Sequence, residues 1–108
     1  MPDSQILFRL EAALHQRKSA APGSSYVASL YAKGLDAVLK KVGEEATEAI
    51  LAAKGDDKSH LTREAADLLF HTLVMLAAKD VALADVLAEL ERREGTSGLD
   101  EKKSRKES

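Results

Sequence analysis

The chain has 108 residues and a formal net charge of −2, with 44% hydrophobic and 31% charged residues. This length suits one domain, and the composition is that of a soluble globular protein. The absence of Cys excludes disulfides, thiolate catalysis and Cys-ligated metal sites. The charge balance gives no reason to expect nucleic acid as a partner, and no segment reads as a signal peptide or a membrane span. We therefore expect a cytoplasmic protein that acts without nucleic acid or membrane.

The first half of the chain predicts three helices and no strand. Residues 4–18 place apolar side chains at three-and-four spacing, which is typical of an amphipathic helix. A loop with proline and glycine follows, and a short helix over 25–33 is expected to end at Gly34, because glycine readily adopts the left-handed conformation that ends helices. Residues 35–54 repeat the apolar spacing over five turns and predict a third, longer helix.

The second half predicts two more helices, over 58–79 and 83–93, with Leu90 buried in the last one. The loops between the last three helices are short, which favours antiparallel neighbours and an all-α bundle of about five helices. The leucine-rich fourth helix is too apolar all round for the surface of a monomer. We therefore expect a homodimer that completes a four-helix core, with one domain over 1–94 and a polar, flexible tail over 95–108.

Four acidic residues form two pairs on consecutive predicted helices. Glu45 and Glu48 belong to the stretch KKVGEEATE, and Glu64 and Asp67 belong to the stretch EAAD. At roughly 100° per residue, the members of each pair lie about 60° apart around their helix and project from one face. If the two helices pack antiparallel through their apolar stripes, the four carboxylates converge at one margin of the interface.

The acidic residues predict a metal site that handles phosphate. Like charges at this spacing repel by a few tenths of a kcal/mol per exposed pair, which a bound cation would offset. Mg²⁺ is the ion that carboxylates and substrate phosphates hold together, and Mn²⁺ could substitute for it. The alternative is a solvated face, since 18 acidic residues in a helical chain often produce such a pair by chance. His71 follows one turn after Asp67, and we interpret it as a satisfied histidine at the core edge rather than a ligand.

Three stretches carry a resemblance to a known family: KGLDAVLKKVGEEATEAILAAK, REAADLLFHTLVMLA and the ending LAELERREGTSGLDEKKSR. Over residues 5–105 the chain resembles the phosphoribosyl-ATP pyrophosphohydrolases. These enzymes belong to the all-α, MazG-like nucleotide pyrophosphohydrolase superfamily, whose signature is EExxE followed by ExxD. The resemblance implies hydrolysis of phosphoribosyl-ATP to phosphoribosyl-AMP and pyrophosphate, the second step of histidine biosynthesis.

The resemblance also assigns roles to the acidic residues. It implies metal ligation by Glu45 and Glu48, the second and third acids of EExxE, and by Glu64 and Asp67, the two acids of ExxD. Glu44 matches the first acid, and we expect it to play a supporting part by orienting the attacking water. All five are candidate catalytic residues.

Basic and hydroxyl side chains are candidates for the substrate phosphates. Around the axis of its predicted helix, Lys41 projects between the directions of Glu45 and Glu48, whereas Lys40 projects more than a right angle away. Lys41 is therefore the better candidate. Surface salt bridges with glutamates one turn later are the alternative for both. At the start of the second predicted helix, the backbone N–H groups and the hydroxyls of Ser25 and Tyr26 could bind a phosphate. Alternatively, Ser25 could simply cap that helix. Lys33 is supported by the resemblance alone.

Three functions follow from these patterns. The first is the Mg²⁺-dependent hydrolase of phosphoribosyl-ATP, which acts as a homodimer. The second keeps the chemistry but acts on canonical or damaged nucleoside triphosphates such as dCTP or dUTP. The third is a non-catalytic helical dimerisation module whose acidic stripe is a solvated face.

Overall fold

The computed structural model describes residues 1–95 and 98–107, and within these residues every regular element is helical. This confirms the all-α class that the apolar spacing predicts. Thr96 and Ser97, which belong to the family-like ending of the chain, and Ser108 lie outside the described residues. The elements are α1 (Ile6–Arg17), the 3₁₀ turn η1 (Pro22–Ser24), α2 (Tyr26–Lys33), α3 (Leu35–Lys54), α4 (Lys58–Ala78), α5 (Leu83–Arg93) and α6 (Gly98–Glu107).

Local capping explains where the central helices begin and end. The Ser25 hydroxyl accepts a hydrogen bond from the Ala28 amide at 3.0 Å at the start of α2. The Asp57 carboxylate accepts one from the His60 amide at 3.1 Å at the start of α4. Between α2 and α3, Gly34 has φ +102° and ψ 173°, a backbone conformation that residues with a Cβ rarely adopt. The chain can therefore turn sharply there and begin α3 at the next residue.

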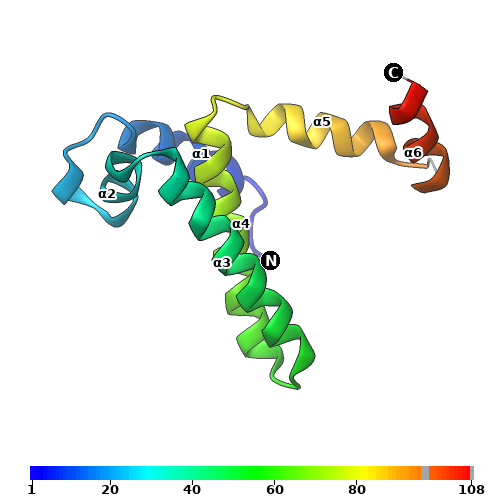
Figure 1. The fold of residues 1–108 in the computed structure, drawn as a ribbon, viewed down its shortest axis with the longest axis horizontal. Coiled ribbons are helices and arrows are strands. Elements are labelled where there is room, and N and C mark those ends of the chain that lie inside the picture. The colour runs from blue at the N-terminus through cyan, green and yellow to red at the C-terminus, as the bar shows by residue number, and fades with distance from the viewer. Residues whose placement is uncertain (96–97, 108) are drawn as a thin grey trace.

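The longest pair of helices, α3 and α4, forms an antiparallel hairpin, and α1 and α2 pack across the end that is away from its turn (Figure 1). The hydrophobic core lies at this covered end. Val38 of α3 and Val74 of α4 are 1% and 0% exposed at its centre. Burial of each such side chain contributes roughly 1.5–3 kcal/mol to folding. The other core residues are Leu14, Val27, Leu30, Leu73, Ala77 and Leu83.

The last two helices leave the body of the molecule. Figure 1 shows α5 running away from the α3–α4 hairpin, with α6 at its far end. Contacts near its start anchor α5: Leu83 is buried, its amide donates to the Glu11 carboxylate of α1 at 2.7 Å, and Leu87 packs partly buried against the core. Leu90 is 56% exposed, so the expectation that it is buried is wrong for a single chain. The reason is the turn after α4, where Asp80 has φ +55° and directs α5 outward instead of back along α4.

The tail also differs from expectation. Helix α6 lies in the segment for which the sequence predicts no element, so the described part of this segment is helical. The flexibility of residues 95–108 and the domain boundary at residue 94 stay predictions. Among the described residues, none of the helices is both long and apolar enough to span a bilayer.

Candidate metal and phosphate site

Three carboxylates from two helices meet at the margin of the α3–α4 interface. Glu45 and Glu48 come from α3 and Glu64 comes from α4, and one ligand oxygen from each lies within 4.8 Å of the others. The antiparallel hairpin brings α4 beside α3 at this level, and the three-residue spacing on α3 presents two acids to it. The structure thus brings together three of the four acids that the sequence predicts to converge. Their role as ligands stays a prediction.

The partial burial of this cluster is compatible with a bound cation. Glu45 is only 6% exposed. One carboxylate oxygen of Glu45 and one of Glu64 are buried without a hydrogen-bond partner among the described residues. Buried polar atoms are normally paired, and an unpaired charged oxygen costs several kcal/mol of desolvation. A donor set made only of carboxylate oxygens is the kind that Mg²⁺ and Mn²⁺ prefer, so the residues present fit such an ion.

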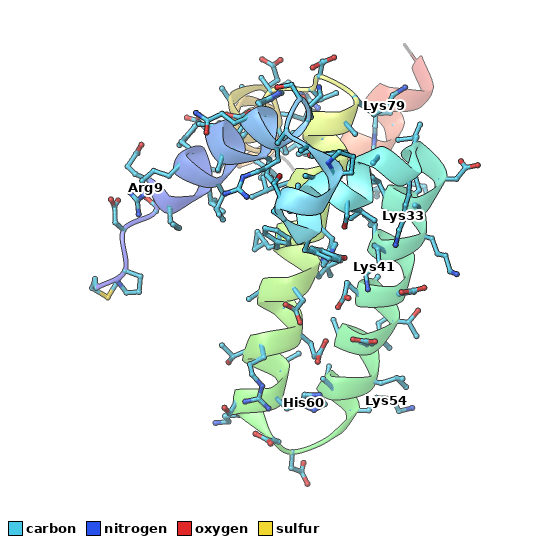
Figure 2. The ribbon with its side chains drawn as sticks, turned by 90° about the vertical axis from the view of Figure 1, so that its left-hand side faces the viewer. Arg9, Lys33, Lys41, Lys54, His60 and Lys79 are labelled. Atoms are coloured by element: carbon cyan, nitrogen blue, oxygen red, sulfur yellow. The ribbon has the colours of Figure 1, made fainter. Side chains whose placement is uncertain are left out.

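Lys41 is the cation nearest to these acids. Its Nζ lies 3.3 Å from Oε1 of Glu45 and 3.4 Å from Oε2 of Glu44. Desolvation lowers the pKa of Lys41, but hydrogen bonds to Glu45 and Glu44 and the charge of Glu45 outweigh it and raise the pKa overall. Figure 2 shows Lys41 on the side of α3 that faces α4. A charged ammonium group is therefore held beside the acidic cluster.

The other predicted phosphate contacts are more peripheral. Lys40 is 78% exposed and lies 3.9 Å from the Glu44 carboxylate, which is the surface pairing foreseen as the alternative. Lys33 ends α2 and lies above Lys41 in Figure 2, and it makes no ion pair with any described residue. Ser25 is engaged as the cap of α2, so its hydroxyl already has a partner.

Asp67 does not join the three clustered acids. It lies on α4 one turn after Glu64, with an exposed side chain. Sequence reasoning missed a different neighbour of Glu64: Nε2 of His60 lies 3.5 Å from Oε1 of Glu64. The four-residue spacing between His60 and Glu64 was the available signal, since such residues are neighbours on a helix surface.

His71 connects α2 to α4 beneath the site. The residue is buried, as expected for a core-edge histidine, and both ring nitrogens have protein partners. Nδ1 lies 2.8 Å from the Asp67 carbonyl oxygen, which can only accept, so Nδ1 carries the proton. Nε2 therefore accepts from the Tyr26 hydroxyl at 3.0 Å. The two bonds fix the position of the half-exposed Tyr26 ring.

Known proteins resemble this chain over nearly its whole length. A model of the family described as phosphoribosyl-ATP pyrophosphohydrolase matches residues 7–94. The chain is 57% identical over 106 residues to the phosphoribosyl-ATP pyrophosphatase of Azoarcus sp. (strain BH72), covering 98% of this chain and 99% of the relative. It is 61% identical over 100 residues to the protein of the same name from Dinoroseobacter shibae, covering 93% and 98% respectively. The resemblance seen in the sequence is confirmed: the chain belongs to the phosphoribosyl-ATP pyrophosphohydrolase family.

Proposed function

We propose that this chain hydrolyses phosphoribosyl-ATP to phosphoribosyl-AMP and pyrophosphate, the second step of histidine biosynthesis. The names of its relatives and the family match support this reaction. The observation that carries the proposal is the carboxylate cluster, in which Glu45 and Glu64 each leave a buried oxygen without a partner. Buried oxygens without a partner destabilise the fold unless a ligand compensates for them.

Mg²⁺ is the cofactor we propose, with Mn²⁺ as a substitute. Glu45, Glu48 and Glu64 would hold it, and Asp67, one turn further along α4, is the fourth proposed ligand. When bound, a divalent ion draws charge from the phosphate oxygens and makes the phosphorus easier for water to attack.

The remaining side chains position the charged part of the substrate. Lys41 would neutralise phosphate oxygens, because its ammonium group already lies against the acids and keeps its charge. Glu44 is partly exposed and would orient the attacking water once Lys41 turns to the substrate. Lys40 and Lys33 would add positive charge at the rim. In the reaction, water attacks the α–β phosphoanhydride, the α–β bond breaks, and phosphoribosyl-AMP, pyrophosphate and a proton are released.

The assembly we propose is a homodimer of the domain over 1–94, located in the cytoplasm and acting without nucleic acid. Large apolar side chains lie exposed along the uncovered half of the hairpin and on α5. Ile50 and Leu51 are each 63% exposed, Leu69 is 50% exposed and Leu90 is 56% exposed. A surface of this kind favours association between two copies. Sedimentation at micromolar concentration should give twice the chain mass, and a monomer would contradict this part of the proposal.

The test of the reaction is pyrophosphate release from phosphoribosyl-ATP with Mg²⁺ and with EDTA. We expect turnover only with the metal, and loss of turnover in Glu45→Gln. Glu91→Gln, which makes the same change on the exposed surface of α5, is the matched control and should retain activity. Preference for dCTP or dUTP over phosphoribosyl-ATP would instead favour the nucleoside triphosphate hydrolase. Family membership disfavours the third hypothesis, a non-catalytic dimerisation module. The absence of any Mg²⁺-dependent turnover would support that hypothesis instead.

A further inference from the structure

A cavity separate from the acidic cluster lies between α1, the start of α2 and α4. Its volume is about 270 Å³, and apolar side chains that include Leu14, Val27 and Phe70 line most of it. The ring of Tyr26 forms part of the wall, and Arg17 of α1 supplies the positive charge. Pockets that hold whole small-molecule ligands measure about 300–1,000 Å³. This cavity is therefore suited to the flat, apolar part of a ligand rather than to a complete nucleotide.

Arg17 has no counter-charge in the described part of the chain. Its side chain makes no ion pair or hydrogen bond with the residues that the structure describes, whereas Arg9, two turns earlier on the same helix, pairs with Asp3 at 3.2 Å. A guanidinium group presents a planar set of donors that matches phosphate oxygens. An unpaired arginine beside an apolar cavity is thus suited to a ligand with an uncharged ring and an anionic group attached to it.

Tyr26 joins this cavity to the proposed reaction site. Its ring lines the cavity, while its hydroxyl donates to His71, which is bonded in turn to the main chain at Asp67. On α4, Asp67 lies one turn after Glu64, which belongs to the acidic cluster. A substrate that occupies the cavity would therefore extend past Tyr26 toward Lys41 and the carboxylates.

We propose, on the basis of the function above, that the cavity receives the purine ring of the substrate and that Arg17 binds the 5′-phosphate of the second ribose. Phosphoribosyl-ATP carries a triphosphate on one ribose and a monophosphate on the other, so the purine lies between two anionic groups. With the ring against Tyr26 and Phe70, the triphosphate points to Lys41 and the monophosphate to Arg17. Arg17 would then distinguish this substrate from ATP, which lacks the second phosphate.

The test compares Arg17→Ala with Arg9→Ala, the matched change on the same helix outside the cavity. For phosphoribosyl-ATP we expect Arg17→Ala to raise KM by about tenfold or more, the loss typical of a charge-assisted contact, with kcat within about twofold. The inhibition constant of ATP as a competitor should not change, and Arg9→Ala should affect neither constant. An unchanged KM for phosphoribosyl-ATP, or an equal rise in that KM and in the inhibition constant of ATP, would overturn the assignment.

A binding measurement separates this inference from the proposed reaction. Calorimetry in EDTA would compare phosphoribosyl-AMP with AMP, so that neither metal nor turnover is needed. We expect the wild type to bind phosphoribosyl-AMP more tightly, and Arg17→Ala to lose that preference. Equal binding of the two nucleotides by the wild type would refute the role of Arg17 even if the enzyme hydrolyses phosphoribosyl-ATP. If the wild type prefers phosphoribosyl-AMP and Arg17→Ala abolishes this preference, the result would support binding of the nucleotide in the cavity, even if turnover were absent.

Discussion

Replacement of Glu45 by Gln should change the stability of the metal-free and the metal-bound protein in opposite directions. The glutamine has nearly the same shape but carries no charge. In the metal-free protein it removes repulsion from Glu48 and Glu64, and its amide can donate to a neighbouring carboxylate oxygen. It also loses the ion pair with Lys41. With Mg²⁺, the same change removes a proposed ligand.

The size of the effect follows from the distances. With an effective dielectric constant of about 20, two like charges at the upper limit of 4.8 Å between the ligand oxygens repel by about 3.5 kcal/mol, and the Lys41–Glu45 pair at 3.3 Å contributes an attraction of about 5 kcal/mol. Two repulsions therefore exceed one attraction by about 2 kcal/mol. Because Glu48 is exposed and the Lys41 side chain is 32% exposed, solvent screening reduces this difference to about 1 kcal/mol. In a domain of this length, that corresponds to a rise in Tm of about 4–8 °C.

Thermal unfolding followed by far-ultraviolet circular dichroism would measure both states, at one protein concentration. In EDTA we expect Glu45→Gln to melt above the wild type. When Mg²⁺ is present at about 100 times its Kd, the wild type should gain about 2.7 kcal/mol and the variant much less, which reverses the order. Glu91→Gln should follow the wild type in both buffers. A variant that melts well below the wild type in EDTA, or that gains as much from Mg²⁺, would refute the electrostatic reasoning.

Three further changes test contacts outside the acidic cluster. Tyr26→Phe removes the donor to buried His71 and should lower the free energy of unfolding by about 1–3 kcal/mol in urea titrations, whereas an unchanged midpoint would mean that the bond contributes nothing. Gly34→Ala places a Cβ at φ +102° and should cost about 1–3 kcal/mol in thermal melts; equal stability would show that the turn relaxes freely. Hydrogen bonds from its two arginine partners on α5 lower the pKa of Glu89 from 4.5 to about 2, so its stabilisation is complete above pH 4.5 and is lost as the pH falls toward 2. The helicity of Glu89→Gln should thus be lower than that of the wild type near neutral pH, and the two should become equal in acid or in high salt. A difference that does not change with pH or salt would exclude the ion pairs as its cause.

Local patterns were sufficient for the helices and for part of the site. Apolar residues at three-and-four spacing predicted the five main helices, and Asp57 begins α4 as a cap residue should. The pairing of Glu45 with Glu48 on one face is also local, because it depends only on the number of residues per helical turn. Lys41 is near Glu45 for the same reason.

The tertiary structure decided which side chains meet across helices. Glu64 reaches the two acids of α3, whereas Asp67, which has the same sequence signal, does not join them. The cavity at Arg17 exists only because α1 packs beside α2 and α4, and nothing in the spacing around Arg17 indicated it. Leu90 follows the apolar pattern and is still exposed, because α5 runs away from the α3–α4 hairpin.

The physical reason is a difference in range. Helix formation, capping and the direction of a side chain around its helix depend on residues within about one turn, which the sequence displays directly. The register of one helix against another is the outcome of many weak packing contacts between distant segments, and a shift of a single turn changes which carboxylates lie close together.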